Sequence, residues 1–221
     1  MNTRFGEKST HSAWPLFRPG MRALALAALV VMLAGCFGGG QQWHWYALDY
    51  TPVFPQGFTM LPETITVEPL TTAQIYRTTA MIYQEDPYQR DQYFQNSWRV
   101  SPADLLADCL LRDLRNSGMF RGVFHYRNAE PSRYLLAGAV EEFQEFYDKE
   151  GRRAVVSLNV SLFDTSGKEF LDRLLFQKNY RFSEPIDEAT PAGLAKGMSL
   201  AVAKVSEQLL ADIYDAVRKV R

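Results

Sequence analysis

The residue best placed to do chemistry is Cys36, which follows Leu33-Ala34-Gly35. Its thiolate is a strong nucleophile and can accept a covalent group. Residues 23–34 before it are uninterruptedly apolar, and four basic residues come earlier. This apolar run is too short to span a bilayer, which takes roughly 20 residues. The order of charged region, apolar region and small-residue cleavage site instead describes a secretory signal peptide, here residues 1–35.

The stretch Leu33-Ala34-Gly35-Cys36 also resembles the bacterial lipobox, in which the cysteine sulfur receives a diacylglycerol and the chain is cut before that cysteine. The resemblance implies a mature chain that begins at Cys36, with diacylglycerol and an N-acyl chain as its only added groups. The alternative is a plain signal peptide with an incidental cysteine. A free thiol would be a liability in an oxidising compartment, whereas an acylated one is not. Met21 is an alternative start that gives the same mature chain.

Candidate catalytic groups are few in the rest of the chain. Glu141, Glu142, Glu145 and Asp148 form the best candidate for a carboxylate pair, but charged residues on the wet face and at the end of a strand are the stronger explanation. Neither a Gly-x-Ser-x-Gly nucleophile elbow nor a glycine-rich phosphate loop occurs in the sequence. We therefore expect a protein that is not an enzyme.

Metal and thiol chemistry are also not expected in the mature chain. Its two histidines, His44 and His125, are far apart and have no nearby cysteine or histidine that could complete a metal site. Cys109 lies among leucines, which is typical of a buried thiol acting as a small apolar residue.

The composition indicates one globular domain. The chain has 221 residues, of which 47% are hydrophobic, and a formal net charge of -1. This length and apolar content suit a domain with a real core and are unlike those of a disordered chain. A nucleic-acid partner would show as a clustered basic face, which the sequence lacks.

A short tether links Cys36 to the domain. We assign residues 36–44 to the lipidated cysteine and tether, and 45–221 to the domain. Residues 37–42 of this tether reach only about 20 Å when fully stretched, so the domain must lie close to the membrane. Aromatic residues near an anchor either rest at the lipid headgroups or open the first strand. We assign Trp45 to a strand that runs to Asp49 and leave Trp43 open between the two.

The remaining pattern predicts strands followed by a helix, twice. Ser101 and Pro102 begin a helix that stops at Ser117-Gly118, and Thr190 and Pro191 begin a long amphipathic one. Strict alternation predicts a strand over 154–163 with Val156, Leu158, Val160 and Leu162 on its buried face. Further strands are expected over 64–69, 81–83, 93–98, 134–147 and 170–182, with a turn or loop over 84–92 and a hairpin turn over 164–167. We expect an α+β domain in which two helices pack on one face of a mainly antiparallel sheet.

Several stretches in order resemble the auxiliary lipoproteins of ABC-type transport systems, the paraquat-inducible protein C family. They are Tyr46-Ala47-Leu48-Asp49, Ile65-Thr66-Val67-Glu68-Pro69, Ile82-Tyr83, the aromatic run ending at Trp98 with Pro102, Leu110 to Leu114 with Ser117-Gly118-Met119-Phe120, and Val140-Glu141-Glu142-Phe143 with Tyr147-Asp148. The order and spacing hold across nearly the whole mature chain. The family often has an arginine after the Ile-Tyr pair, where this chain has Gln84.

The resemblance implies a lipoprotein on the periplasmic face of the outer membrane that assists a transporter whose periplasmic subunit carries mammalian-cell-entry (MCE) domains. Phe37 rather than Asp follows Cys36, and an Asp there resembles an inner-membrane retention signal. The transported compounds would be lipids or other hydrophobic molecules. The oligomeric state stays open, with a homo-oligomer included.

Two kinds of function fit this resemblance. An adaptor would dock on the MCE subunit, whereas a carrier would itself bind a lipid in a sizeable apolar cavity. We favour the adaptor, because the apolar stripes suffice for a two-layer core without a surplus. Its expected docking residues are Tyr88, Tyr93 and Phe94, aromatic rings within a polar stretch, which suit an interface.

Overall fold

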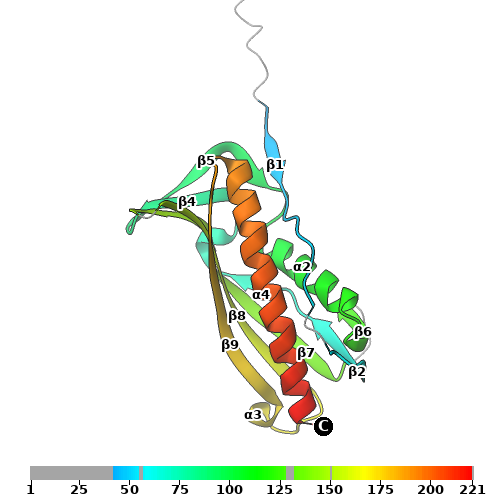
Figure 1. Cartoon of the computed structure of the whole chain (residues 1–221). Helices are drawn as coiled ribbons and strands as arrows, with labels where there is room; N and C mark the ends of the chain where they lie inside the picture. The colour runs from blue at the N-terminus through cyan, green and yellow to red at the C-terminus, as the bar shows by residue number, and fades with distance from the viewer. Residues whose placement is uncertain (1–41, 55–56, 128–131, 150, 221) are drawn as a thin grey trace, which may run out of the picture. The chain divides into compact units, whose positions relative to one another are not determined.

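The structure is a computed structural model that describes residues 42–54, 57–127, 132–149 and 151–220 (Figure 1). Residues from Gln42 onward form one compact unit. The predicted signal peptide over 1–35 and the predicted lipidation site Cys36 lie outside the described residues. The first strand begins at His44, inside the segment assigned to the tether, and it ends at Tyr46 instead of Asp49.

The described residues build one mixed sheet, curled around the helices (Figure 1). Its strands are β1 His44–Tyr46, β2 Leu61–Val67, β3 Thr71–Thr72, β4 Ala80–Asp86, β5 Gln89–Trp98, β6 Phe120–His125, β7 Tyr134–Asp148, β8 Gly151–Asp164 and β9 Leu174–Pro185. Strand β7 is the centre, since it pairs with β2, β3 and β4 on one side and with β8 on the other.

The expected α+β class is confirmed, but the expectation of a mainly antiparallel sheet is wrong. Five of the eight pairings among the described strands are parallel, and only β4–β5, β7–β8 and β8–β9 are antiparallel. Strands β2 and β6 are parallel because the chain between them crosses over through the helix α2. Alternation in a sequence shows which face of a strand is buried, but not which strand lies beside it.

The two long helices begin and end where their capping residues predict. Helix α2 spans Pro102–Asn116, the Ser101 hydroxyl accepts a hydrogen bond from the Asp104 amide, and Gly118 takes a positive φ of 62° just beyond the end. Helix α4 spans Pro191–Lys219, and Thr190 caps it by accepting from the Gly193 amide at 3.0 Å. Two short helices complete the fold, η1 over Gln74–Tyr76 and α3 over Phe170–Arg173.

Helix α4 packs along β8 and β9 and also contacts α2, so the main core lies between helices and sheet. The predicted buried face of β8 is confirmed, because its four alternating aliphatic residues are all buried. Two glycines let α4 lie close to the segment before it and to β8. A Cβ on Gly193 would clash with the Glu188 carbonyl oxygen, and a Cβ on Gly197 would lie 3.1 Å from the Ala154 Cβ of β8.

Two local expectations have the wrong bounds. The turn or loop expected over 84–92 is reduced to a tight turn at Pro87-Tyr88, because β4 and β5 continue up to it on both sides. The hairpin projects into solvent, so its residues show no apolar alternation to reveal the strands. The last strand begins at Leu174 instead of Phe170, because α3 fills the start of that segment and makes the β8–β9 connection longer than a hairpin turn.

Candidate partner interface

The β4–β5 hairpin places Tyr88 at its tip, where the ring is 96% exposed. The turn is fixed locally, since the Asp86 carboxylate accepts from the Tyr88 amide at 2.9 Å. The Arg90 guanidinium donates to the Pro87 carbonyl at 3.1 Å and braces the turn from the other strand. A large ring held in full solvent on an ordered turn is available for contact with another molecule.

A bulge in β5 exposes Phe94. Ala80 pairs with Ser97 and Ile82 with Gln92, so four residues of β5 lie opposite the single Met81 of β4. Within this bulge Gln95 takes a positive φ of 58°. The bulge interrupts the alternation of side chains, and Phe94 is left 72% exposed instead of packing on the core.

Tyr93 differs from these two residues, because it supports the hairpin from within. Its hydroxyl donates to Oε2 of Glu145 on β7 at 2.6 Å, and its ring contacts that of Tyr83 with centroids 5.2 Å apart. Arg152 of β8 pairs with the other oxygen of Glu145 at 2.6 Å. Burial and the Glu145 carboxylate raise the pKa of the Tyr93 hydroxyl, so it remains a donor at neutral pH. The sequence grouped Tyr93 with Tyr88 and Phe94, but the structure makes it a positioning residue.

The position where the family often has arginine is buried beneath the same hairpin. Gln84 of β4 accepts a hydrogen bond from the Gln144 amide group at 2.9 Å, and both side chains are buried. This bond joins β4 to β7, the strand pair that carries the hairpin. Gln84 therefore fixes the base of the hairpin and does not offer a surface contact.

The hairpin borders a hollow of about 350 Å³. Helix η1 and the segment after it form one wall through Ile75 and Thr78, and the hairpin forms the other through Ile82 and residues 90–92. Ile75 is itself exposed. We refer to Tyr88, Phe94 and the rim of this hollow as the hairpin surface. The same hairpin therefore carries two exposed rings and one wall of a hollow, and a partner's anchoring side chain could enter that hollow.

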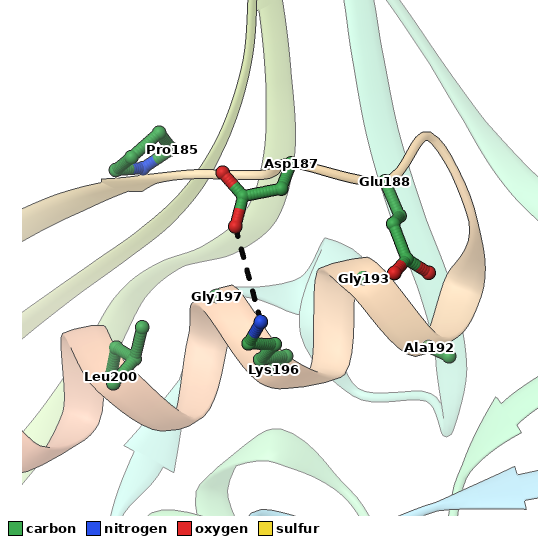
Figure 2. A pocket seen from close by; sticks show the side chains of 8 residues that line it. All are labelled: Pro185, Asp187, Glu188, Ala192, Gly193, Lys196, Gly197 and Leu200. Atoms are coloured by element: carbon green, nitrogen blue, oxygen red, sulfur yellow. Dashed lines mark ion pairs between the residues drawn. The ribbon is translucent and has the colours of Figure 1, made fainter.

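Other hollows among the described residues are small or lined by charge. Figure 2 shows one of about 150 Å³ at the start of α4, where Asp187 lies 3.9 Å from Lys196 across the opening. Another, of about 410 Å³, lies between β9 and the end of α4. Its walls contain the apolar Leu175 and Phe176 and also the charged Lys178 and Asp212. Charged walls of this kind do not match the enclosed apolar cavity that a lipid carrier needs.

The sequence analysis missed a buried acid, Asp113 of α2, which is 0% exposed. Its carboxylate accepts from the Tyr50 hydroxyl at 2.6 Å, from the Ser206 hydroxyl of α4 at 2.6 Å and from Arg112 at 2.8 Å. Burial raises the pKa of Tyr50 above its usual range, so that hydroxyl stays protonated. This network ties both helices to the segment after β1, and without access to solvent Asp113 acts as a structural group. Its place on the apolar stripe of α2, between Leu110 and Leu114, is the signal that could have found it.

The candidate carboxylates do not converge on one site. Glu145 is buried in its network with Tyr93, whereas Glu142 pairs with Arg181 and Glu141 accepts from Asn179 at 2.5 Å. Cys109 is buried, as expected, and burial raises the pKa of its thiol. In the described part of the chain no three His, Cys, Asp or Glu residues are grouped so that they could hold a metal ion. None of the described helices is both long and apolar enough to cross a membrane.

Solved structures show the same fold. XCC0632 from Xanthomonas campestris, of the DUF330 family, superposes with a TM-score of 0.72 at 19% identity over 79% of this chain and 97% of that chain. An uncharacterized protein superposes with a TM-score of 0.61 at 16% identity over 78% of this chain and 99% of that chain. At these identities the likeness concerns the fold alone.

The family comparison covers most of the chain. No curated protein matches the chain. Residues 46–210, which run from the end of β1 into the last third of α4, match the family of ABC-type transport auxiliary lipoprotein components. This segment contains the hairpin surface and its supports at Gln84, Tyr93 and Glu145. The chain belongs to the ABC-type transport auxiliary lipoprotein family.

Proposed function

We propose that this protein is a lipid-anchored adaptor that holds the MCE-domain subunit of an ABC transport system at the outer membrane. In this proposal Cys36 carries the lipid, and the domain works by binding instead of catalysis. Membership of the transport auxiliary family supports the connection to an ABC system. The lipobox-like stretch supports the anchor, and Phe37 after it supports the outer membrane.

The observation that carries the proposal is the exposure of Tyr88 and Phe94 on a braced hairpin. Aromatic side chains dominate binding energy at protein interfaces because they bring a large contact area at a small cost in side-chain entropy. The turn and the Tyr93–Glu145 bond fix the hairpin before any partner arrives, and such preorganisation lowers the ordering cost of association. We assign the hairpin surface to the MCE subunit.

Co-purification from detergent-solubilised membranes tests the assignment. The lipidated protein is captured through a C-terminal tag, and MCE-domain protein in the eluate is identified and quantified by mass spectrometry. We expect the double variant Tyr88→Ala with Phe94→Ser to retain less than about a tenth of the wild-type amount, since each hot-spot ring contributes about 2 kcal/mol or more.

A matched control uses Tyr126, an exposed ring that follows β6 at the opposite edge of the sheet from the hairpin. Tyr126→Ser should leave MCE capture unchanged. Thermal melts of each variant separate lost contact from lost fold, and both variants should melt near the wild type. A wild-type protein that recovers no MCE-domain protein contradicts the adaptor. Normal capture by the double variant contradicts only the location of the site.

A further inference from the structure

Two tryptophans at the start of the described chain are exposed. Trp43 is 53% exposed and Trp45 is 64% exposed, whereas Trp98 on the adjacent strand is only 1% exposed. Trp45 lies within β1, and Trp43 lies two positions earlier, directly before the strand begins at His44. Neither ring is assigned to the hairpin surface.

The backbone beneath the indoles is firmly held. Strand β1 pairs in parallel with β5, and the Tyr46 carbonyl accepts from the Arg99 amide at 2.7 Å. The Tyr46 hydroxyl donates to the Asn96 side chain at 3.2 Å, and its ring packs against the core. Because Tyr46 faces inward, Trp45 beside it must face outward. Trp45 is thus presented on a fixed strand, and Trp43 directly precedes that strand. The exposed side chain of Arg99 lies next to β1.

The length of chain before β1 identifies what the indoles meet. Seven residues lead from Cys36 to Trp43, and they span at most about 25 Å. This step rests on the proposed lipidation of Cys36, which places that residue at the bilayer surface. Indole rings prefer the headgroup layer of a bilayer, where the apolar ring is covered and the N–H can still find a hydrogen-bond partner. Arginine can reach the lipid phosphates in the same layer.

We propose that Trp43 and Trp45 insert into the phospholipid headgroup layer beside the lipid anchor and form a second, non-covalent membrane contact. This contact orients the domain. The segment after β1 follows α4 toward its end, since the Asp49 amide bonds Ser199 and the Thr59 amide bonds Tyr214. The start of α4 therefore faces the membrane, and its C-terminal end points toward the periplasm.

Fluorescence quenching tests this contact in the lipidated protein. The protein is reconstituted in phosphatidylethanolamine–phosphatidylglycerol vesicles that contain phosphatidylcholine brominated on its acyl chains near the headgroup. Once the leader has been removed, Trp43, Trp45 and Trp98 are the only indoles. We expect brominated lipid to remove up to about two thirds of the emission, because two of the three rings reach the headgroup layer. The variant Trp43→Ser with Trp45→Ser keeps only buried Trp98 and should show almost no quenching.

The conservative variant Trp43→Phe with Trp45→Tyr separates membrane contact from simple loss of signal. After the same reconstitution, it should withstand extraction by high salt and mild detergent as well as the wild type does, whereas the double serine variant should be extracted more readily. If brominated lipid quenches the wild type no more than it quenches the double serine variant, the proposal is overturned. The exposed indoles would then be available to bind a protein partner instead. The mass of the intact protein reports lipidation separately. An unlipidated chain overturns this proposal together with the anchor, and weak quenching of a fully lipidated chain overturns this proposal alone.

Discussion

The hydroxyl of Tyr93 on β5 donates to the buried carboxylate of Glu145 on β7 at 2.6 Å, although β4 lies between these two strands. Glu145 also pairs with Arg152 of β8, so the three side chains join three strands beneath the hairpin. This relationship separates the residues that support the hairpin surface from those that can touch a partner.

Replacing Tyr93 by Phe should destabilise the fold by about 2 kcal/mol, since it removes a hydrogen bond to a buried charge while keeping the ring. Urea unfolding followed by circular dichroism measures the change. Tyr88→Phe serves as the control and should unfold at the wild-type urea concentration, because its hydroxyl is in solvent. Equal midpoints for the two variants would show that the Tyr93–Glu145 bond contributes nothing.

Asp113→Asn should cost about 3 kcal/mol of unfolding free energy, as is typical when one partner of a buried charge network is lost. The amide nitrogen of Asn cannot accept from the hydroxyls that Asp113 now satisfies. Asp108→Asn changes the same charge on the exposed side of α2 and should remain within about 0.5 kcal/mol of wild type. A similar loss in both variants would mean that net charge, and not the network, decides the effect.

The pair of Arg133 and Asp164 should make stability depend on pH in the acid range. Burial opposes ionisation of Asp164, but hydrogen bonds from Arg133 and Ser166 outweigh it and lower the pKa to about 2 from an ordinary 3.8. Because the folded-state pKa is the lower one, this stability is present above about pH 4 and is lost as the pH falls toward 2. The difference corresponds to about 2 kcal/mol.

Urea unfolding at pH 5 and near pH 2 checks this linkage. Arg133→Gln should be less stable than wild type at the higher pH and should lose less stability on acidification. If the wild type and the variant lose equal stability on acidification, Arg133 does not set the pKa of Asp164.

Capping residues in the sequence predicted where the two long helices begin, but the sequence did not predict which strands pair with each other. Ser101 and Gly118 bound α2, and Thr190 begins α4, because capping depends on residues within one turn. The parallel pairing of β2 with β7 depends on the crossover path of the whole chain, which alternation does not encode. Of the expected docking rings, exposure of Tyr88 and Phe94 agrees with an interface role, whereas the role of Tyr93 depends on Glu145, fifty-two positions away.

Cys36→Ser should abolish lipid attachment, because in the proposed lipobox the Cys36 sulfur is the nucleophile that receives the diacylglyceryl group. Metabolic labelling with palmitate should mark the wild type and not the variant, and globomycin should block processing of the wild type only. Cys109→Ser is the matched control, since that thiol is buried and its loss should leave labelling intact. Label that persists in Cys36→Ser would disprove the assignment of the anchor.

Site-specific photocrosslinking from the hairpin tip tests the adaptor most directly. A benzoylphenylalanine at position 88 replaces an exposed ring by another and can react with whatever lies against it in the intact membrane. We expect a crosslink to the MCE-domain subunit from position 88 and none from position 126. Crosslinks to that subunit from position 126 alone, or from neither position, would contradict docking through the hairpin surface.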